Sequence, residues 1–223
     1  MRQDSLIIYL HGFASSPGSY KATLFRRYFA SSGVSLVIPD LEGGDFRNLT
    51  VTSQINIIRQ TIYENPAERY GLVGSSMGGY LALLTAQMEP RVRCLYLMCP
   101  GINFVSRWKK KVMGEFKPNE KFPSLIQVFN YRYNKIVDLN SSLFQDAETW
   151  DSLNLERCLP TRLVHGAQDE VVPLEGSRSF CQTRPWVELV ELDSDHGLLS
   201  HGRWIVKDAF RFFQSQNLIN GGQ

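Results

Sequence analysis

The sequence predicts an α/β fold in which helices cover both faces of a mostly parallel sheet. Short apolar runs alternate along the chain with longer stretches whose apolar residues recur at helical spacing. The first run, residues 6–10, is almost wholly apolar, which is typical of a strand buried on both faces. Residues 102–157 interrupt the alternation and are too many for a plain connection. We therefore expect a core of residues 1–101 and 158–223, with a helical cap or lid inserted at 102–157.

The strands and helices can be assigned in chain order. A first helix is expected to end at Gly33, and Thr50 or Thr52 could cap a second helix that ends before Pro66. A third helix covers the apolar residues from 80 to 88, and a last helix contains residues 205–213. Strands that alternate with helices form right-handed βαβ units, so the sheet should be parallel. The six predicted strands are residues 6–10, 36–38, 70–73, 92–99, 161–164 and 187–192.

The composition is that of an ordinary globular chain. With 24 Lys and Arg against 22 Asp and Glu, the net charge of +2 gives no reason to expect a nucleic acid or an anionic membrane as partner. The first apolar run is far too short to span a membrane, and no signal-peptide cleavage site follows it. The cysteines show no CxxC spacing, so we expect reduced thiols and a cytoplasmic protein; they are Cys94, Cys99, Cys158 and Cys181.

The sharpest motif is a G-x-S-x-G sequence at residues 74–78, between a predicted strand and a predicted helix. Its outer residues, Gly74 and Gly78, are small enough for the strand and the helix to approach each other closely. A serine on so tight a turn exposes its hydroxyl at a helix N-terminus, where N–H groups favour developing negative charge. We therefore predict Ser76 as a nucleophile and Ser75 as a structural neighbour. The alternative is a plain glycine-rich turn.

A serine nucleophile needs a base within hydrogen-bond reach, and a carboxylate that orients the base. In this architecture the order along the chain is Ser, then Asp or Glu, then His. His196 follows the last predicted strand and is the expected base, with His201 as the alternative. Asp169 follows the fifth predicted strand and is the expected acid, unless it only caps a turn. Glu170 and Asp195 are competitors by residue type.

Acyl transfer also needs N–H donors for the oxyanion of the tetrahedral intermediate. The N–H of Met77, directly after the predicted nucleophile, is one candidate. The N–H of Phe13, in the loop after the first strand, is the second, because Gly12 lets the chain turn beneath the serine. We expect His11 to hold this loop by hydrogen bonds. The alternative for the whole segment is a plain strand end.

The residues quoted above resemble the α/β-hydrolase superfamily in type, spacing and order. The segments that carry the resemblance run from residue 9 to residue 197 and include His165-Gly166 before Asp169. More narrowly, Leu10-His11-Gly12-Phe13, Ser15-Ser16-Pro17 and the short chain are similar to the small YqiA-like esterases. This resemblance implies an α/β-hydrolase fold and hydrolysis of carboxylic esters or thioesters without a metal or an organic cofactor. The inserted residues match no pattern, so the resemblance implies nothing about the physiological substrate.

The leading expectation is therefore a serine hydrolase that acts on a small-molecule ester or thioester through an acyl-enzyme. Two alternatives use the same fold. One is a hydrolase or lyase that acts on a carbon–carbon bond or a CoA-linked intermediate with the same three side chains. The other is a binding protein with little catalysis, although such a protein has no need for all three side chains.

The insertion is rich in aromatic residues and divided in charge. Its aromatic side chains, which include Phe104, Trp108, Phe116, Phe122 and Phe144, could line an acyl pocket or simply pack the insertion onto the sheet. Residues 104–135 are basic and residues 136–156 are acidic. The basic half could bind an anionic substrate through residues 109–111, but the two halves could equally neutralise each other at the surface.

Overall fold

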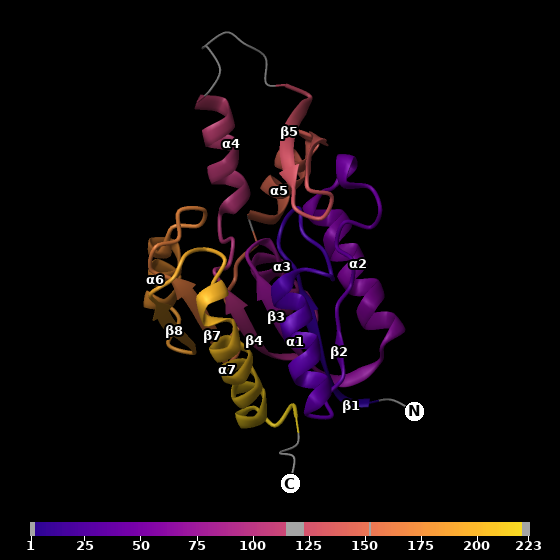
Figure 1. The fold of residues 1–223 in the computed structure, drawn as a ribbon, viewed down its shortest axis with the longest axis vertical. Coiled ribbons are helices and arrows are strands. Elements are labelled where there is room, and N and C mark those ends of the chain that lie inside the picture. The colour runs from indigo at the N-terminus through magenta and orange to yellow at the C-terminus, as the bar shows by residue number, and fades with distance from the viewer. Residues whose placement is uncertain (1–2, 115–122, 152, 220–223) are drawn as a thin grey trace.

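The computed structural model describes residues 3–114, 123–151 and 153–219, and the predicted fold class is confirmed. Figure 1 shows the sheet at the centre with helices on either side. Its six strands are all parallel and run in the order β2-β1-β3-β4-β7-β8. Their bounds are Gln3–Leu10 for β1, Leu36–Val37 for β2, Ala67–Ser75 for β3, Val92–Met98 for β4, Thr161–Gly166 for β7 and Val187–Leu192 for β8.

Helices bury both faces of this sheet, as the apolar first strand predicts. Ile8 and Leu10 of β1 belong to one hydrophobic cluster, whereas Ile7 and Tyr9 belong to the other. The first cluster lies under α2 (Val51–Glu64), α3 (Met77–Met88) and α6 (Leu174–Gln182). The second lies under α1 (Tyr20–Ser31) and α7 (Gly202–Ser215). Across the residues that the structure describes, no helix combines the length and apolar character needed to cross a membrane.

Several local predictions are confirmed and one helix was missed. Thr50, not Thr52, caps α2, because its hydroxyl accepts from the N–H of Ser53 in a capping box. Gly33 follows α1 with a φ of 72°, a left-handed conformation that glycine adopts readily. Strand β3 begins at Ala67, three residues before the prediction, because its start pairs with the equally early start of β1. Helix α6 was not predicted. Short 3-10 turns complete the core at Phe46–Asn48 (η1) and Leu199–His201 (η2).

The insertion lies between β4 and β7 and contains a hairpin as well as the expected helices. It consists of α4 (Phe104–Gly114), the antiparallel strands β5 (Leu125–Asn130) and β6 (Lys135–Asn140), and α5 (Ser142–Asp151). Figure 1 shows these elements together at one end of the molecule, beyond the sheet. The predicted aromatic residues Phe116 and Phe122 lie outside the described residues.

The tip of the hairpin is bonded to two loops of the core. The N–H of Tyr131 donates to the carbonyl oxygen of Ala14 at 2.9 Å. The side-chain amide of Asn130 donates to the carboxylate of Glu42 at 2.8 Å, and both side chains are buried. The insertion is thus attached directly beside the loop that contains Phe13.

Candidate active site

Ser76 occupies the strained turn that joins β3 to α3. Its φ of 54° and ψ of −119° are sparsely populated for a residue with a side chain, and such strain is often found at functional positions. Its N–H donates to the carbonyl oxygen of Met98 at 2.9 Å, and its own carbonyl accepts from Gly101 at 2.8 Å. Residues 71–75 and 77–80 are buried, whereas Ser76 is partly exposed. The turn therefore presents this one residue at the carboxyl edge of the sheet.

Glycines on both sides of the turn allow the backbones to approach. A Cβ on Gly74 would lie 2.5 Å from the carbonyl oxygen of Gly78. A Cβ on Gly78 would lie 2.1 Å from the carbonyl oxygen of Leu10. Real Cβ atoms do not approach backbone this closely, so both glycines are required by packing, as the motif predicts.

We expect Gly78→Ala to lower the free energy of unfolding by at least about 3 kcal/mol, because the added methyl group must displace the backbone of β1. Urea denaturation measures this loss. Gly114→Ala is the matched control, since a Cβ there meets nothing within 4 Å and should leave stability nearly unchanged. Equal stabilities of the two variants would contradict the packing argument.

His196 and Asp169 are brought together from the loops after β8 and β7. Nδ1 of His196 lies 2.7 Å from Oδ2 of Asp169. The side chain of Asp169 is fully buried, whereas that of His196 is 22% exposed, so a substrate could reach the imidazole but not the carboxylate. Since an ionised carboxylate can only accept, Nδ1 carries the proton and Nε2 is left with a free lone pair.

The carboxylate of Asp169 is held on both oxygens. Oδ1 accepts from the N–H groups of Val171 at 2.9 Å and Val172 at 2.7 Å. Oδ2 lies 3.1 Å from Nε2 of His165 and 2.7 Å from Nδ1 of His196. Burial alone would raise the pKa of Asp169, but hydrogen bonds from His165, His196 and Val172 outweigh it and hold the pKa well below its usual range. The group is therefore an anion at neutral pH.

This lowered pKa predicts how stability depends on pH. A carboxyl group whose pKa is lower in the folded than in the unfolded chain stabilises the fold above its unfolded pKa, about 3.9, and this contribution is lost as the pH falls. We expect wild type to be more stable than Asp169→Asn at pH 7, with the difference shrinking below about pH 5. Urea denaturation at pH 7, 5 and 3 tests this. A difference that stays constant over this range would contradict it.

The predicted oxyanion donors belong to two segments next to Ser76, namely the loop after β1 and the first residue of α3. Among the described residues, the N–H groups of Phe13 and Met77 have no hydrogen-bond acceptor. A Cβ on Gly12 would lie 3.4 Å from Cβ of Ser76, so the loop that contains Phe13 passes directly over the serine. His11 holds this loop as expected: its Nε2 accepts from the N–H of Leu41 at 3.0 Å, and its Nδ1 donates to the carbonyl oxygen of Gly12 at 2.9 Å. Burial lowers the pKa of His11, which favours this neutral form.

The competing side chains have other surroundings. Nδ1 of His201 lies 3.0 Å from the hydroxyl of Ser200. The carboxylate of Asp195 accepts from the N–H of Leu198 at 3.1 Å, which is a local contact within its own turn. Glu170 is exposed, and Ser75 is buried. None of these described contacts joins His201, Asp195 or Glu170 to the His196–Asp169 pair.

Two buried residues next to Asp169 were not predicted as site residues, namely Cys99 and His165. The ligand atoms of Cys99, His165 and Asp169 lie within 4.8 Å of one another, a spacing that could suit a metal ion. However, Nε2 of His165 lies 2.8 Å from the carbonyl oxygen of Val172 and must carry a proton there. Burial also raises the pKa of Cys99 to about 12, so it remains a thiol. These side chains fit a polar support for Asp169 better than a metal site. His165 precedes Gly166 at a strand end, and this position was the sequence signal for it.

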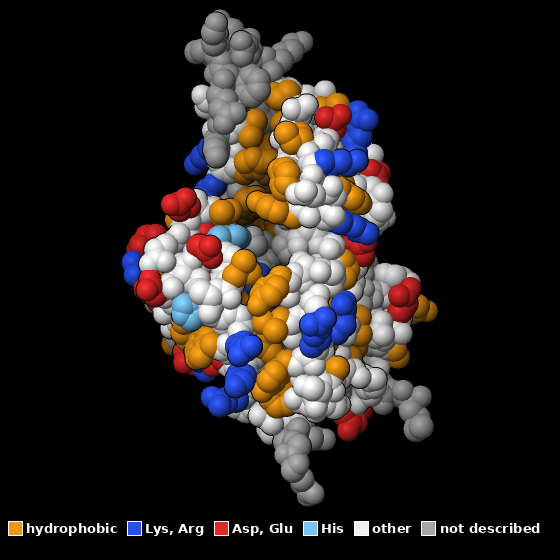
Figure 2. All heavy atoms as spheres, viewed as in Figure 1, with side chains coloured by type: hydrophobic (Ala, Val, Ile, Leu, Met, Phe, Trp, Pro, Cys, Tyr) orange, Lys and Arg blue, Asp and Glu red, His pale blue; other side chains and the backbone are white. Residues whose placement is uncertain are grey.

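Aromatic rings from the core and the insertion meet beside Ser76. The ring of Phe13 lies 5.3 Å from that of Trp108 and 6.2 Å from that of Phe104, centroid to centroid. A Cβ added to Gly101 would lie 3.1 Å from Cβ of Phe104 and 3.4 Å from the carbonyl oxygen of Ser76. Phe104 therefore lies close to the serine. Figure 2 shows hydrophobic side chains on the insertion bordering a hollow, with a histidine beside it.

The charged halves of the insertion contact each other. The ammonium of Lys109, in the basic half, pairs with the carboxylate of Glu148, in the acidic half. This pair agrees with the alternative in which the two halves neutralise each other at the surface. Two further basic residues of the 104–135 half, Lys117 and Lys121, lie outside the described residues.

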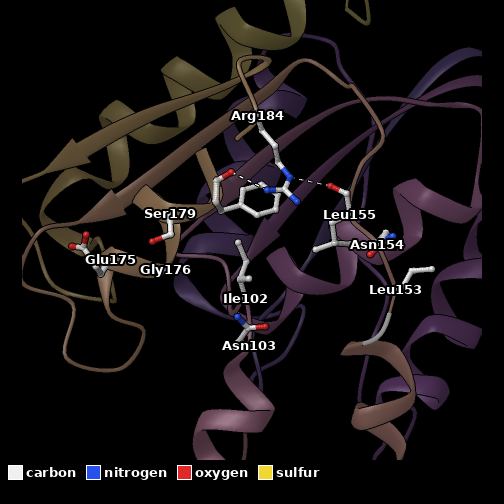
Figure 3. A pocket seen from close by; sticks show the side chains of 10 residues that line it. Ile102, Asn103, Leu153, Asn154, Leu155, Glu175, Gly176, Ser179 and Arg184 are labelled. Atoms are coloured by element: carbon white, nitrogen blue, oxygen red, sulfur yellow. Dashed lines mark hydrogen bonds between the residues drawn. The ribbon is translucent and has the colours of Figure 1, made fainter. Parts of the chain in front are cut away.

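A separate pocket of about 560 Å³ lies beside the start of α4 (Figure 3). The guanidinium of Arg184 forms part of its wall and donates to the carbonyl oxygens of Leu155 at 3.0 Å and Phe180 at 3.1 Å. Ser76, Asp169 and His196 do not line this pocket. It is therefore distinct from the site that contains the contact between His196 and Asp169. Its lining residues are Ile102, Asn103, Leu153, Asn154, Leu155, Glu175, Gly176, Ser179, Phe180 and Arg184.

Known proteins resemble this chain in sequence and in fold. Esterase YjfP of Escherichia coli (strain K12) is 28% identical over 192 residues, which cover 77% of this chain and 71% of YjfP. Est1E from Butyrivibrio proteoclasticus superposes with a TM-score of 0.79 at 20% identity, over 98% of this chain and 90% of Est1E. The α/β-hydrolase domain-containing protein 10 from mouse superposes with a TM-score of 0.76 at 22% identity, over 94% of this chain and 89% of the mouse protein.

These findings confirm the predicted resemblance and support a hydrolase of the esterase type. The solved structures share the fold, and the curated relative carries the name of an esterase. The sequence profile of the Uncharacterised protein family (UPF0227) matches residues 6–209, which is nearly the whole chain. The chain therefore has the α/β-hydrolase fold and belongs to the UPF0227 family.

Proposed function

We propose that the protein is a serine hydrolase that cleaves carboxylic esters or thioesters of small molecules. The observation that carries this proposal is the 2.7 Å contact from His196 to the buried, ionised Asp169, at the same sheet edge as the strained turn of Ser76. A binding protein would not require a strained serine, an accessible imidazole and a buried anion at one sheet edge.

In the first half of the reaction, Nε2 of His196 removes the proton of the Ser76 hydroxyl as its oxygen attacks the substrate carbonyl carbon. Asp169 fixes the imidazole in the tautomer whose Nε2 can accept, and its charge stabilises the imidazolium that forms. The N–H groups of Phe13 and Met77 donate to the developing oxyanion, which fits their lack of another acceptor among the described residues. His196 then protonates the leaving alcohol or thiol.

In the second half, water takes the place of the leaving group. His196 removes a proton from the water, the hydroxide attacks the acyl carbon, and the same two N–H groups stabilise the second oxyanion. Collapse of this intermediate releases the carboxylic acid and returns the proton to Ser76. Each step uses groups of this chain and water.

The surroundings of Ser76 favour an ester with an apolar acyl group. Phe13, Phe104 and Trp108 form an aromatic wall beside the serine, and all three are only partly buried by the rest of the chain. Apolar surface of the substrate placed against this wall would be removed from water, which contributes roughly 25 cal/mol per Å².

A fluorophosphonate probe tests the proposal, because only an activated serine reacts quickly with it. We expect stoichiometric labelling at Ser76. In separate assays of the unlabelled protein, we expect turnover of p-nitrophenyl esters and acyl-CoA thioesters, compared over several acyl chain lengths. The absence of both labelling and turnover in folded protein would refute the proposed function.

A further inference from the structure

His165 lies fully buried at the end of β7, and each of its ring nitrogens has a partner. Nε2 lies 2.8 Å from the carbonyl oxygen of Val172 and 3.1 Å from Oδ2 of Asp169. Nδ1 lies 2.8 Å from the hydroxyl of Ser177 on α6. The ring therefore connects a helix of the core to the carboxylate that contacts His196.

The chemistry of these partners assigns the proton. A carbonyl oxygen and a carboxylate oxygen can only accept, so Nε2 of His165 carries a hydrogen that both of them share. The hydroxyl of Ser177 can donate to Nδ1. A neutral ring with its proton on Nε2 thus satisfies all three contacts without a positive charge on His165.

With this donor counted, the carboxylate of Asp169 has no free position. Oδ1 accepts two backbone N–H groups, and Oδ2 accepts from His165 and from His196. An ionised carboxylate offers about four lone-pair sites, so all are occupied. The carboxylate cannot rotate without losing a hydrogen bond in a buried place, where an unpaired polar group is costly.

We propose that His165 is a positioning residue of this site, whose Nε2–H holds Oδ2 of Asp169 in the orientation that His196 needs and limits how strongly that oxygen attracts a proton. This inference rests on the proposed function. Without this donor, Oδ2 would lose one of its hydrogen bonds, the carboxylate would be less well oriented, and it would stabilise the cationic imidazole more strongly. Catalysis would then be slower and would require a higher pH.

Other charged or titratable groups lie near this cluster, and the variants at residue 165 leave each of these side chains in place. They are Lys21 of α1, Cys99 after β4, Arg107 of α4, Glu191 of β8, and Asp195 and His196 after β8. Both His165→Leu and His165→Gln remove the imidazole and its interaction with Glu191, but only the leucine variant also lacks an N–H donor. A shift in the pH profile that appears in the leucine variant alone can therefore be assigned to the lost donor.

The test compares wild type with His165→Leu, His165→Gln and Ser177→Ala on p-nitrophenyl acetate, with rates divided by the number of sites that a fluorophosphonate labels at completion. For His165→Leu we expect kcat to fall about 10- to 100-fold, KM to change less than about threefold, and the acid limb of kcat/KM to move to higher pH. His165→Gln, whose amide N–H can replace the Nε2–H, should recover to within about threefold of wild type. Ser177→Ala should show a smaller fall in the same direction.

A structural role alone would reduce the number of labelled sites and the melting temperature, but it would leave kcat per labelled site and the acid limb unchanged. That result for His165→Leu would overturn the proposal. NMR of ¹⁵N-histidine-labelled wild type covers the case in which the leucine variant does not fold. We expect His165 to keep its proton on Nε2 through the active pH range, and a proton on Nδ1 instead would also overturn it. Failure of wild type to react with the probe would refute the proposed function itself, and the NMR result would still decide the tautomer.

Discussion

Ser76→Ala is expected to lower kcat for p-nitrophenyl esters at least about 10⁴-fold and to abolish fluorophosphonate labelling, while the fold is retained. The hydroxyl is the atom that forms the bond to the acyl carbon in the proposed mechanism, and no other group of the turn can replace it. Alanine preserves the strained backbone and the surrounding packing. Steady-state rates and mass spectrometry of the labelled protein measure the loss.

Ser75→Ala is the matched control for this prediction. Ser75 is the neighbouring serine, but its side chain is buried. The Ser75→Ala variant should therefore keep wild-type labelling and most of the activity. Ser76→Gly should be as inactive as Ser76→Ala but more stable by about 1 kcal/mol, since glycine adopts a φ of 54° without strain. Activity that persists in Ser76→Ala, or is lost only in Ser75→Ala, would show that the nucleophile is assigned wrongly.

Asp169→Asn is expected to lower kcat about 10³- to 10⁴-fold with little change in overall structure. The asparagine amide can donate to Nδ1 of His196, which would move the imidazole proton to Nε2. An imidazole in that tautomer cannot accept the proton of Ser76. The amide also lacks the charge that stabilises the imidazolium, so binding of substrate should suffer less than turnover.

Steady-state kinetics on the same esters test this second prediction. Asp195→Asn and His201→Gln are its controls, because each replaces a competitor of the same type that does not contact the His196–Asp169 pair. Both should stay within about threefold of wild type. If Asp195→Asn were the more damaging change, the acid would have to be reassigned.

Much of the candidate site could be predicted because its signals are local. The spacing of Gly74 and Gly78 around Ser76 reflects a backbone approach that only glycine permits, since a Cβ added to either glycine would lie 2.5 Å or less from a backbone oxygen. Asp169 could be preferred over Asp195 because Asp195 directly precedes His196, and the side chains of neighbouring loop residues tend to diverge, whereas Asp169 lies on the adjacent loop at the same edge of the sheet. The Asp169–His196 contact agrees with that selection.

The hairpin of the insertion and the surroundings of Asp169 could not be predicted in this way. Among the described residues, β5 and β6 pair only with each other, and Asn130 at their tip donates to a buried carboxylate 88 positions away in the sequence. Likewise, His165 contacts Ser177 and Asp169 only because α6 packs beside β7. Each of these contacts depends on which segments the folded chain places side by side.

The sequence by itself therefore determined the α/β class, the strained serine turn and the order along the chain of the predicted catalytic side chains, because each of these follows from short-range sterics or from the direction of the strands. Only the tertiary structure decided which donors surround Asp169, which tautomers His11, His165 and His196 adopt, and which aromatic rings stand beside Ser76. These properties depend on burial and on hydrogen-bond partners far away in the chain, and spacing along the sequence does not encode them.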